Sequence, residues 1–286
     1  MMTKQLTRWN LSSIPLIAAL ALGILTASVH ADELADKGRE IFQKNLHAVV
    51  TVQVVMKASR AGSSGNESKQ DITGTVIDAS GLTVVALSAC DPSEMYRRLS
   101  EESKVEVEVT DVKILLEDGT ELNSEIVLRD KDLDLAFIRP KTKPAHPMAF
   151  VDFTKTGTAQ VLEPVITLNR LNKAASRAQS AATDRISAVI QKPRTFYTTE
   201  SGMGGTLGVP AFLLDGKILG IYVVRAVSAA GGPVNIRQNL SAIILPAEDI
   251  VKAAQQAPEA KPESDKKDDS DEAKPAAENT SANAEK

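Results

Sequence analysis

Hydrophobic and polar residues alternate in short runs along most of the chain, as they do in β-strands with one buried face. The run 47–56 (HAVVTVQVVM) is rich in β-branched residues, and residues 105–116 place Val105, Val107 and Val109 beside charged neighbours. Comparable patterns predict further strands at 72–79, 82–87, 121–128, 133–138, 159–168, 186–190 and 240–245, with polar loops at 58–70 and 169–183. This regular antiparallel pattern favours a barrel or a sandwich over α/β layers.

Turns and a few short helices separate these runs. Ser80-Gly81, Asp118-Gly119 and Asp215-Gly216 predict tight turns between strands. Helices are expected at 32–44, 91–100 and 246–256. The second begins with Asp91-Pro92, an N-cap followed by Pro at the first helical position, and the third begins at Pro246 with two acidic residues in its first turn.

The first 31 residues have the pattern of a secretory signal peptide. Lys4 and Arg8 precede an apolar run at 11–26, and Val29-His30-Ala31 is typical of a cleavage site. A membrane anchor fits less well, because the run is short and contains Pro15. The residue directly after the cleavage site is Asp32 and not Cys, so a lipoprotein is not expected. We expect a protein exported to the periplasm or the extracellular space, with no stable membrane span after cleavage.

Charge and cysteine content argue against a nucleic-acid-binding protein and against a disulfide-stabilised fold. Residues 257–286 carry nine acidic and five basic residues without apolar periodicity, which predicts a disordered tail. The tail is interpreted as solubilising, with a tail-mediated contact as the alternative. The whole chain has a net charge of −4, the tail contributes −4 and the signal peptide +2, so the folded part is near −2 and nothing points to nucleic acid. The single Cys90 cannot form an internal disulfide.

The stretch 198–223 (TTESGMGGTLGVPAFLLDGKILGIYV) predicts a Gly-rich loop, a strand, a tight turn and a second strand. It resembles the region around the nucleophile in trypsin-like proteases of the HtrA/Deg group, where Gly-Asn-Ser-Gly-Gly-Pro precedes a strand, an Asp-Gly turn and a strand. Residues 74–88, 112–140, 184–190 and 240–254 are also similar to segments of that family, in the same order, so the resemblance covers roughly residues 46–253.

The resemblance implies an all-β fold of two six-stranded antiparallel Greek-key barrels, with short helices and a C-terminal helix. It divides residues 32–256 into an N-barrel at about 46–140, a C-barrel at about 148–245 and the closing helix 246–256. The Pro-containing segment 141–147 then connects the barrels. The peptide-binding PDZ module that follows the protease domain in many family members has no counterpart before the tail.

The resemblance also assigns the catalytic positions, and two of the three lack the family's residue. Counting back from the Asp-Gly turn places Leu207 where the family has its nucleophilic Ser, while Ser88 stands in the place of the His and Asp134 in the place of the Asp. A leucine has no nucleophilic atom, so acyl-enzyme chemistry at this position is excluded. Asp134 is then expected to be a buried acid that accepts hydrogen bonds from Ser88 or from backbone donors.

Gly205 and the amide of Leu207 fall on the family's two oxyanion-hole positions, which need no particular side chain. Two interpretations stay open: a preformed pair of N–H groups that binds a carbonyl or carboxylate, or a Gly-rich loop whose amides face water or a neighbouring strand.

Displaced catalytic residues are the main alternative. Thr206 lies one position early on an extended segment, so its side chain faces the other way, and Ser201 lies six positions early. Of the three histidines, His30 leaves with the signal peptide, and His47 and His146 are remote from the position of Asp134 in the predicted fold. Cys90 has no His beside it and is interpreted as a small buried residue. No metal, phosphate-loop or dinucleotide motif occurs, so no metal or cofactor is expected.

These observations favour an exported, catalytically inactive HtrA/trypsin-like pseudoprotease that binds a peptide or protein as a scaffold. The alternative is an active trypsin-like serine endopeptidase with displaced catalytic residues. A third hypothesis is a structural protein of the envelope whose barrels only present the tail.

Overall fold

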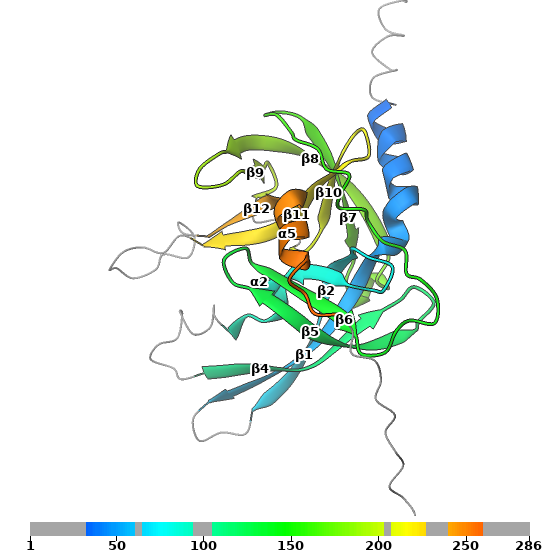
Figure 1. Ribbon diagram of the computed structural model, residues 1–286, viewed down its shortest axis with the longest axis vertical. Helices are drawn as coiled ribbons and strands as arrows, with labels where there is room; N and C mark the ends of the chain where they lie inside the picture. The colour runs from blue at the N-terminus through cyan, green and yellow to red at the C-terminus, as the bar shows by residue number, and fades with distance from the viewer. Residues whose placement is uncertain (1–32, 61–64, 94–104, 203–206, 227–239, 260–286) are drawn as a thin grey trace, which may run out of the picture.

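In the computed structural model, residues 33–60, 65–93, 105–202, 207–226 and 240–259 are described. Two closed six-stranded barrels follow each other along the chain (Figure 1). The N-barrel consists of β1 (Val49–Arg60), β2 (Asn66–Val76), β3 (Thr83–Ala86), β4 (Val105–Leu115), β5 (Glu121–Asp130) and β6 (Leu135–Pro140). Its order is β1-β2-β3-β6-β5-β4, and all of its ladders are antiparallel.

The C-barrel repeats this order. It consists of β7 (Pro164–Arg170), β8 (Gln179–Ile190), β9 (Phe196–Thr199), β10 (Pro210–Leu213), β11 (Ile218–Ala226) and β12 (Leu240–Pro246). Its strands pair as β10-β11-β12-β9-β8-β7, again antiparallel. The predicted fold class, two six-stranded antiparallel barrels with short helices and a C-terminal helix, is confirmed.

The turn and helix predictions are mostly confirmed. Gly119 and Gly216 adopt left-handed φ angles of 87° and 81° in the predicted Asp-Gly turns, a conformation that glycine adopts without steric cost. A helix covers residues 33–45 and continues into the 3₁₀ turn η2 (Leu46–Ala48), and the closing helix α5 spans Ala247–Ala254. The helix expected at 91–100 lies mostly outside the described residues. The short α2 (Leu87–Cys90) precedes it, where the preceding strand was expected to run on to residue 87.

Three strand predictions are wrong in detail. The loop expected at 58–70 is largely strand, because β1 and β2 continue as a ladder as far as Ala58 and Asn66 with exposed polar side chains. The loop expected at 169–183 contains the end of β7, the 3₁₀ turn η3 (Lys173–Ala175) and the first five residues of β8. Residues 159–163 precede β7 instead of belonging to it. In the two segments expected to be loops, exposed side chains hide the alternation on which a strand prediction rests.

One apolar cluster joins the two barrels, and we call it the interbarrel cluster. Its buried members include Leu82, Val84, Leu135 and Phe137 of the N-barrel, Ile166, Leu168, Phe196, Phe212, Ile221 and Val223 of the C-barrel, Ile41 of the N-terminal helix and Ala247, Ile250 and Ala253 of α5. Polar contacts surround it: Arg170 Nε donates to the carbonyl of Val49 (2.8 Å), and Arg177 Nε binds Asp71 Oδ2 (2.7 Å). The barrels therefore form one packed unit with a shared core.

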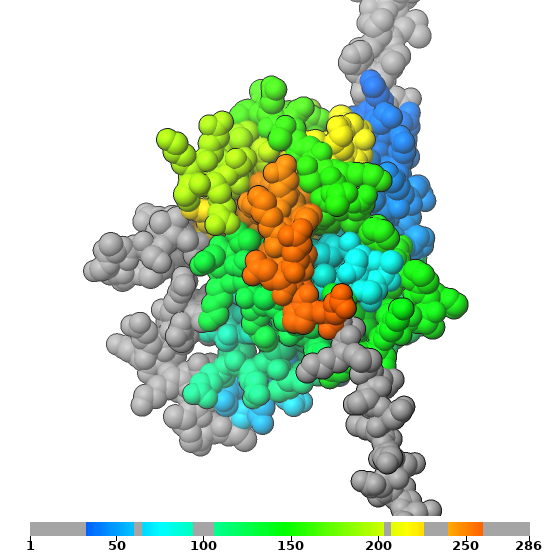
Figure 2. All heavy atoms as spheres, in the orientation of Figure 1, coloured from blue at the N-terminus to red at the C-terminus, as the bar shows by residue number. Residues whose placement is uncertain are grey.

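Residues 247–259, which we call the C-terminal strap, cross from one barrel to the other (Figure 2). Helix α5 leaves the C-barrel after β12 and buries Ile250 in the interbarrel cluster. The strap ends on the N-barrel, where the almost buried Arg139 of β6 donates through Nε to the carbonyl of Pro258 (3.1 Å). Residues 257–259, which were assigned to the disordered tail, are thus in contact with the N-barrel; the rest of that segment lies outside the described residues.

Candidate functional site

Asp134 lies in the turn between β5 and β6 and is held from several directions. Its φ angle of 57° places it in the left-handed region, which is unfavourable for a residue with a side chain unless the surroundings fix it. Here they do, because its carbonyl accepts a hydrogen bond from the amide of Leu87 (2.9 Å). The half-buried carboxylate lies between α2 and β11.

Three donors reach this carboxylate. The Ser88 amide donates to Oδ1 (2.7 Å), and the Ser88 hydroxyl donates to Oδ2 (2.9 Å). The amide of Val224, in the C-barrel, also donates to Oδ2 (2.7 Å). The hydrogen bond predicted between Ser88 and Asp134 is therefore confirmed, and the carboxylate connects the two barrels.

Burial raises the pKa of Asp134 to about 6, although the amides of Val224 and Ser88 and the Ser88 hydroxyl act in the opposite direction. The three donors all favour the charged form, yet they do not offset the loss of hydration. Among the described residues, no cation contributes to the pKa of this carboxyl group. The hydrogen bonds to Asp134 therefore do not offset the cost of burying its charged form.

The Gly-rich stretch approaches the N-barrel directly at Gly208. Its φ angle is 81°, and a Cβ atom there would lie 2.4 Å from the carbonyl oxygen of Thr73 on β2. Only glycine permits this approach. The Gly208 carbonyl accepts a hydrogen bond from Thr75 Oγ1 (3.4 Å), and the preceding Leu207 is partly buried against the interbarrel cluster. Gly205 and Thr206 lie outside the described residues.

One edge of β11 brings Leu207 and Asp134 together. The Gly208 amide donates to the carbonyl of Tyr222 (2.7 Å), and the Tyr222 amide donates to that of Val209 (3.0 Å). Two residues further along the same edge, the Val224 amide donates to Asp134. Alternate residues of a strand direct their backbone groups to the same edge, so Asp134 continues the line that Gly208 and Val209 begin. The three positions Ser88, Asp134 and Leu207 therefore adjoin one strand edge between the barrels.

Sequence reasoning missed the part that Val224 plays here, since a backbone amide carries no residue-specific signal. It also missed a second buried carboxylate, Asp184 on β8. Asp184 accepts hydrogen bonds from the Tyr222 hydroxyl (3.1 Å), the Arg185 amide (2.7 Å) and the Ser201 amide (3.4 Å). Burial alone would raise the pKa of Asp184, but donors from Thr199, Arg185, Ser201 and Tyr222 hold it below its ordinary value.

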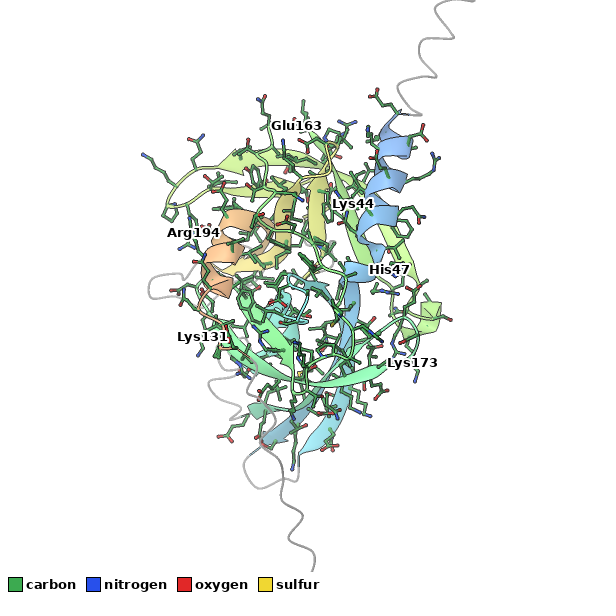
Figure 3. The ribbon with its side chains drawn as sticks, turned by 45° about the vertical axis from the view of Figure 1, so that its right-hand side comes forward. Lys44, His47, Lys131, Glu163, Lys173 and Arg194 are labelled. Atoms are coloured by element: carbon green, nitrogen blue, oxygen red, sulfur yellow. The ribbon has the colours of Figure 1, made fainter. Side chains whose placement is uncertain are left out.

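The described histidines are engaged elsewhere. His47 is exposed and lies 2.9 Å from Glu117 Oε2 through Nδ1. In Figure 3 it lies at the base of the N-terminal helix, on the side of the view opposite Lys131, which belongs to the turn that leads into Asp134. His146 is exposed in the segment that connects the barrels. Neither supplies an imidazole to Asp134, whose side-chain partners among the described residues are Ser88 and Val224.

The other candidate chemistries also lack support from the geometry. Ser201 is exposed, and its amide contacts Asp184 rather than Asp134. Cys90 is fully buried, and burial raises the pKa of its thiol to about 12, which keeps it protonated. Within the described ranges, no group of three or more His, Cys, Asp or Glu side chains has an arrangement that could hold a metal ion. The described part of the chain also has no helix that is both long and apolar enough to cross a membrane.

Two six-stranded antiparallel barrels with an Asp at their junction define the class of trypsin-like peptidase folds. The family model for the trypsin-like peptidase domain matches residues 72–221, which is more than half of the chain. This protein belongs to that family. The solved structures that match include the protease domain of MamO from Magnetospirillum magneticum in its apo form, which is 15% identical, with 74% of this chain and 97% of that chain covered and a TM-score of 0.46. A search of curated proteins found no match.

Proposed function

We propose that this protein is an exported, catalytically inactive member of the trypsin-like family that binds an extended peptide segment between its two barrels. The observation that carries the proposal is the environment of Asp134. A triad needs an imidazole between the carboxylate and the nucleophile. Here the Ser88 hydroxyl and two backbone amides occupy the carboxylate, and a leucine adjoins the same strand edge.

The open edge of β11 supports the binding part of the proposal. β11 pairs with β10 only as far as Ile221, and Tyr222 completes this side with Gly208 and Val209. From Val223 to Ala226 the strand pairs with β12 alone among the described strands. The backbone groups of Val224 and Ala226 face the unpaired side, and only the Val224 amide has a partner there among the described residues, Asp134. An extended peptide could add a strand at this edge.

The loss of catalysis is tested on the mature chain, residues 32–286, with a fluorophosphonate probe and with casein. We expect no labelling and no hydrolysis, with trypsin as the positive control. Leu207→Ala should change neither result. Labelling that persists in Leu207→Ala but disappears in Ser201→Ala or Thr206→Ala would instead support the alternative, an active serine endopeptidase with displaced catalytic residues.

Strand addition is tested by removing one backbone donor. Ala226→Pro deletes the amide that faces the open edge and leaves the ladder to β12 intact, since that amide points away from β12. Peptides selected from a random dodecapeptide phage library should bind the parent protein and lose affinity for Ala226→Pro. The control Ala226→Val keeps the amide and should bind normally. Equal binding to all three proteins would place the ligand elsewhere.

A further inference from the structure

Arg225 is the charged residue of β11 beside its open edge, between Val224 and Ala226, and the strand pattern fixes the side to which it points. Tyr222 is part of the apolar core inside the C-barrel, whereas Val223 belongs to the interbarrel cluster. Successive side chains alternate between the two faces of a strand. Arg225 therefore lies on the same face as Val223, the one that faces the N-barrel.

The guanidinium group of Arg225 rests on an aromatic ring. Its Cζ lies 4.7 Å from the centre of the Phe196 ring, and Phe196 is buried in the interbarrel cluster. A cation over an aromatic face is attracted to the ring but keeps its full charge and its outward N–H donors. The side chain is thus held in one place, half exposed, at the rim of the interbarrel cluster.

None of the ion pairs between described residues includes Arg225. Along the sequence, no Asp or Glu occurs between Asp215 and Glu248, and Asp215 is already paired with Lys217. The carboxylate closest along the β11 edge, that of Asp134, receives its hydrogen bonds from Ser88 and Val224. The face of β11 beside the open edge therefore carries, at Arg225, a positive charge that has no ion-pair partner among the described residues.

We propose that Arg225 gives the peptide site a preference for an acidic residue, Asp or Glu, beside Val224 and Ala226. This inference rests on the proposed function. A peptide strand paired with this edge directs every second side chain to the face of Arg225, and cross-strand neighbours lie about 5 Å apart at Cβ. A carboxylate at that position meets the guanidinium at hydrogen-bonding range and neutralises its charge.

The test selects peptides from a random dodecapeptide phage library on the immobilised mature chain and on Arg225→Gln. The best binder is then synthesised with its acidic residue intact and with Gln in its place, and both affinities are measured by fluorescence anisotropy. We expect acidic residues to be enriched at one position on the parent protein and not on Arg225→Gln. The Gln peptide should bind about fivefold more weakly to the parent and about equally to the variant.

Two controls separate charge from position. Lys217→Gln removes the same charge at the distant end of the β10–β11 hairpin and should keep the acidic preference, and Arg225→Lys should keep part of it. On the unmodified protein, rising salt should weaken the acidic peptide more than its Gln counterpart, so the inference is tested even if Arg225→Gln fails to fold. Selected peptides without an acidic position would overturn the role of Arg225 and leave the proposed function intact. If no peptide is selected at all, both the inference and the proposed function fall.

Discussion

Asp134 lies in the N-barrel and Asp184 in the C-barrel, and both carboxylates are at least partly shielded from solvent. Their surroundings shift their pKa values in opposite directions. Burial raises the pKa of Asp134 to about 6 against three hydrogen bonds, whereas the hydrogen bonds to Asp184 outweigh its burial and lower its pKa. Both accept backbone amides. The difference is that Asp184 also receives three side-chain hydroxyl contributions from the C-barrel, those of Thr199, Ser201 and Tyr222, while Asp134 receives only that of Ser88.

The contrast lies in how well each carboxylate is compensated for its burial. Asp184 is matched by its surroundings, since it accepts from the Tyr222 hydroxyl and from the Ser201 amide at the start of the Gly-rich stretch. Asp134 is under-compensated, because its donors are neutral groups and do not offset the loss of hydration.

The largest effect should come from removing the well-matched acid. Asp184→Ala leaves the Tyr222 hydroxyl and the Arg185 and Ser201 amides without their acceptor, and we expect the free energy of unfolding to fall by about 3 kcal/mol or more. Chemical denaturation at neutral pH measures this. Asp184→Asn keeps one acceptor oxygen and should cost less. A loss below about 1 kcal/mol in Asp184→Ala would show that Asp184 is not the anchor inferred here.

Asp134 should instead affect how the free energy of unfolding depends on pH. Because the folded-state pKa of Asp134 is about 6, above its ordinary value of 3.8, the folded protein binds the proton more tightly than the unfolded chain. This contribution to stability is fully present below about pH 4 and is lost as pH rises through 6, a change of about 3 kcal/mol at 1.36 kcal/mol per pKa unit. Urea unfolding from pH 4 to 7 measures it.

Asp134→Asn cannot ionise, so its stability should lack this decline relative to the parent. The amide also replaces one acceptor by a donor facing Ser88 or Val224, which lowers stability at every pH. Parallel pH profiles for the two proteins would contradict the raised pKa. Asp184 provides the opposite slope in the same experiment, since its lowered pKa makes its contribution present above about pH 4 and lost in more acidic solution.

A smaller effect is expected at Leu207, in the Gly-rich stretch. Leu207→Ser replaces a partly buried side chain of the interbarrel cluster by a hydroxyl, and stability should fall by about 1 to 2 kcal/mol. Leu162→Ser is the matched control, because Leu162 is 66% exposed. If both substitutions are neutral, the contact between Leu207 and the cluster does not contribute to stability. Leu207 would then lie in a groove that is open to water.

The smallest effect concerns Arg139, whose guanidinium group binds one partner in the N-barrel and one in the strap. Arg139 binds the Ser80 hydroxyl (2.6 Å) and the Pro258 carbonyl (3.1 Å). A chain that ends at Gln256 loses the second partner, and its melting temperature should fall by about 2 to 4 °C, which corresponds to about 1 kcal/mol. A chain that ends at Glu259 keeps the contact and should melt like the full mature protein. If both truncated chains have the same melting temperature, residues 257–259 do not contribute to the stability of the fold.

The sequence predicted the barrels well because most strands alternate and the Asp-Gly turns are distinct. It missed β9, since Phe196–Thr199 is only four residues long, although its aromatic and β-branched composition was a usable signal. It also missed the start of β8, where Ala181, Ala182 and Thr183 are exposed. Small and exposed side chains leave no periodicity to detect.

The candidate site was predictable only where a residue type carries the information. Leu207 excludes a nucleophile by its chemistry alone, and Asp134 needed a donor that Ser88 could supply. The Val224 amide and the joining of Asp184 to Tyr222 depend on which strands become neighbours in the folded C-barrel, so no local pattern encodes them. The position of Arg225 over the Phe196 ring likewise depends on the folded arrangement of β9 and β11, which the sequence pattern does not reveal.

The strap has a consequence for the order in which the protein is made. Arg139 and the carbonyl of Pro258 are 119 residues apart, and α5 is built from the last described residues of the chain. During synthesis the N-barrel emerges first, but the apolar surface that it shares with Ile250 and Ala253 stays uncovered until the ribosome has passed residue 253. Contacts of such high sequence separation slow folding. The nascent chain therefore exposes an incompletely covered apolar surface while residues 141–253 are being synthesised.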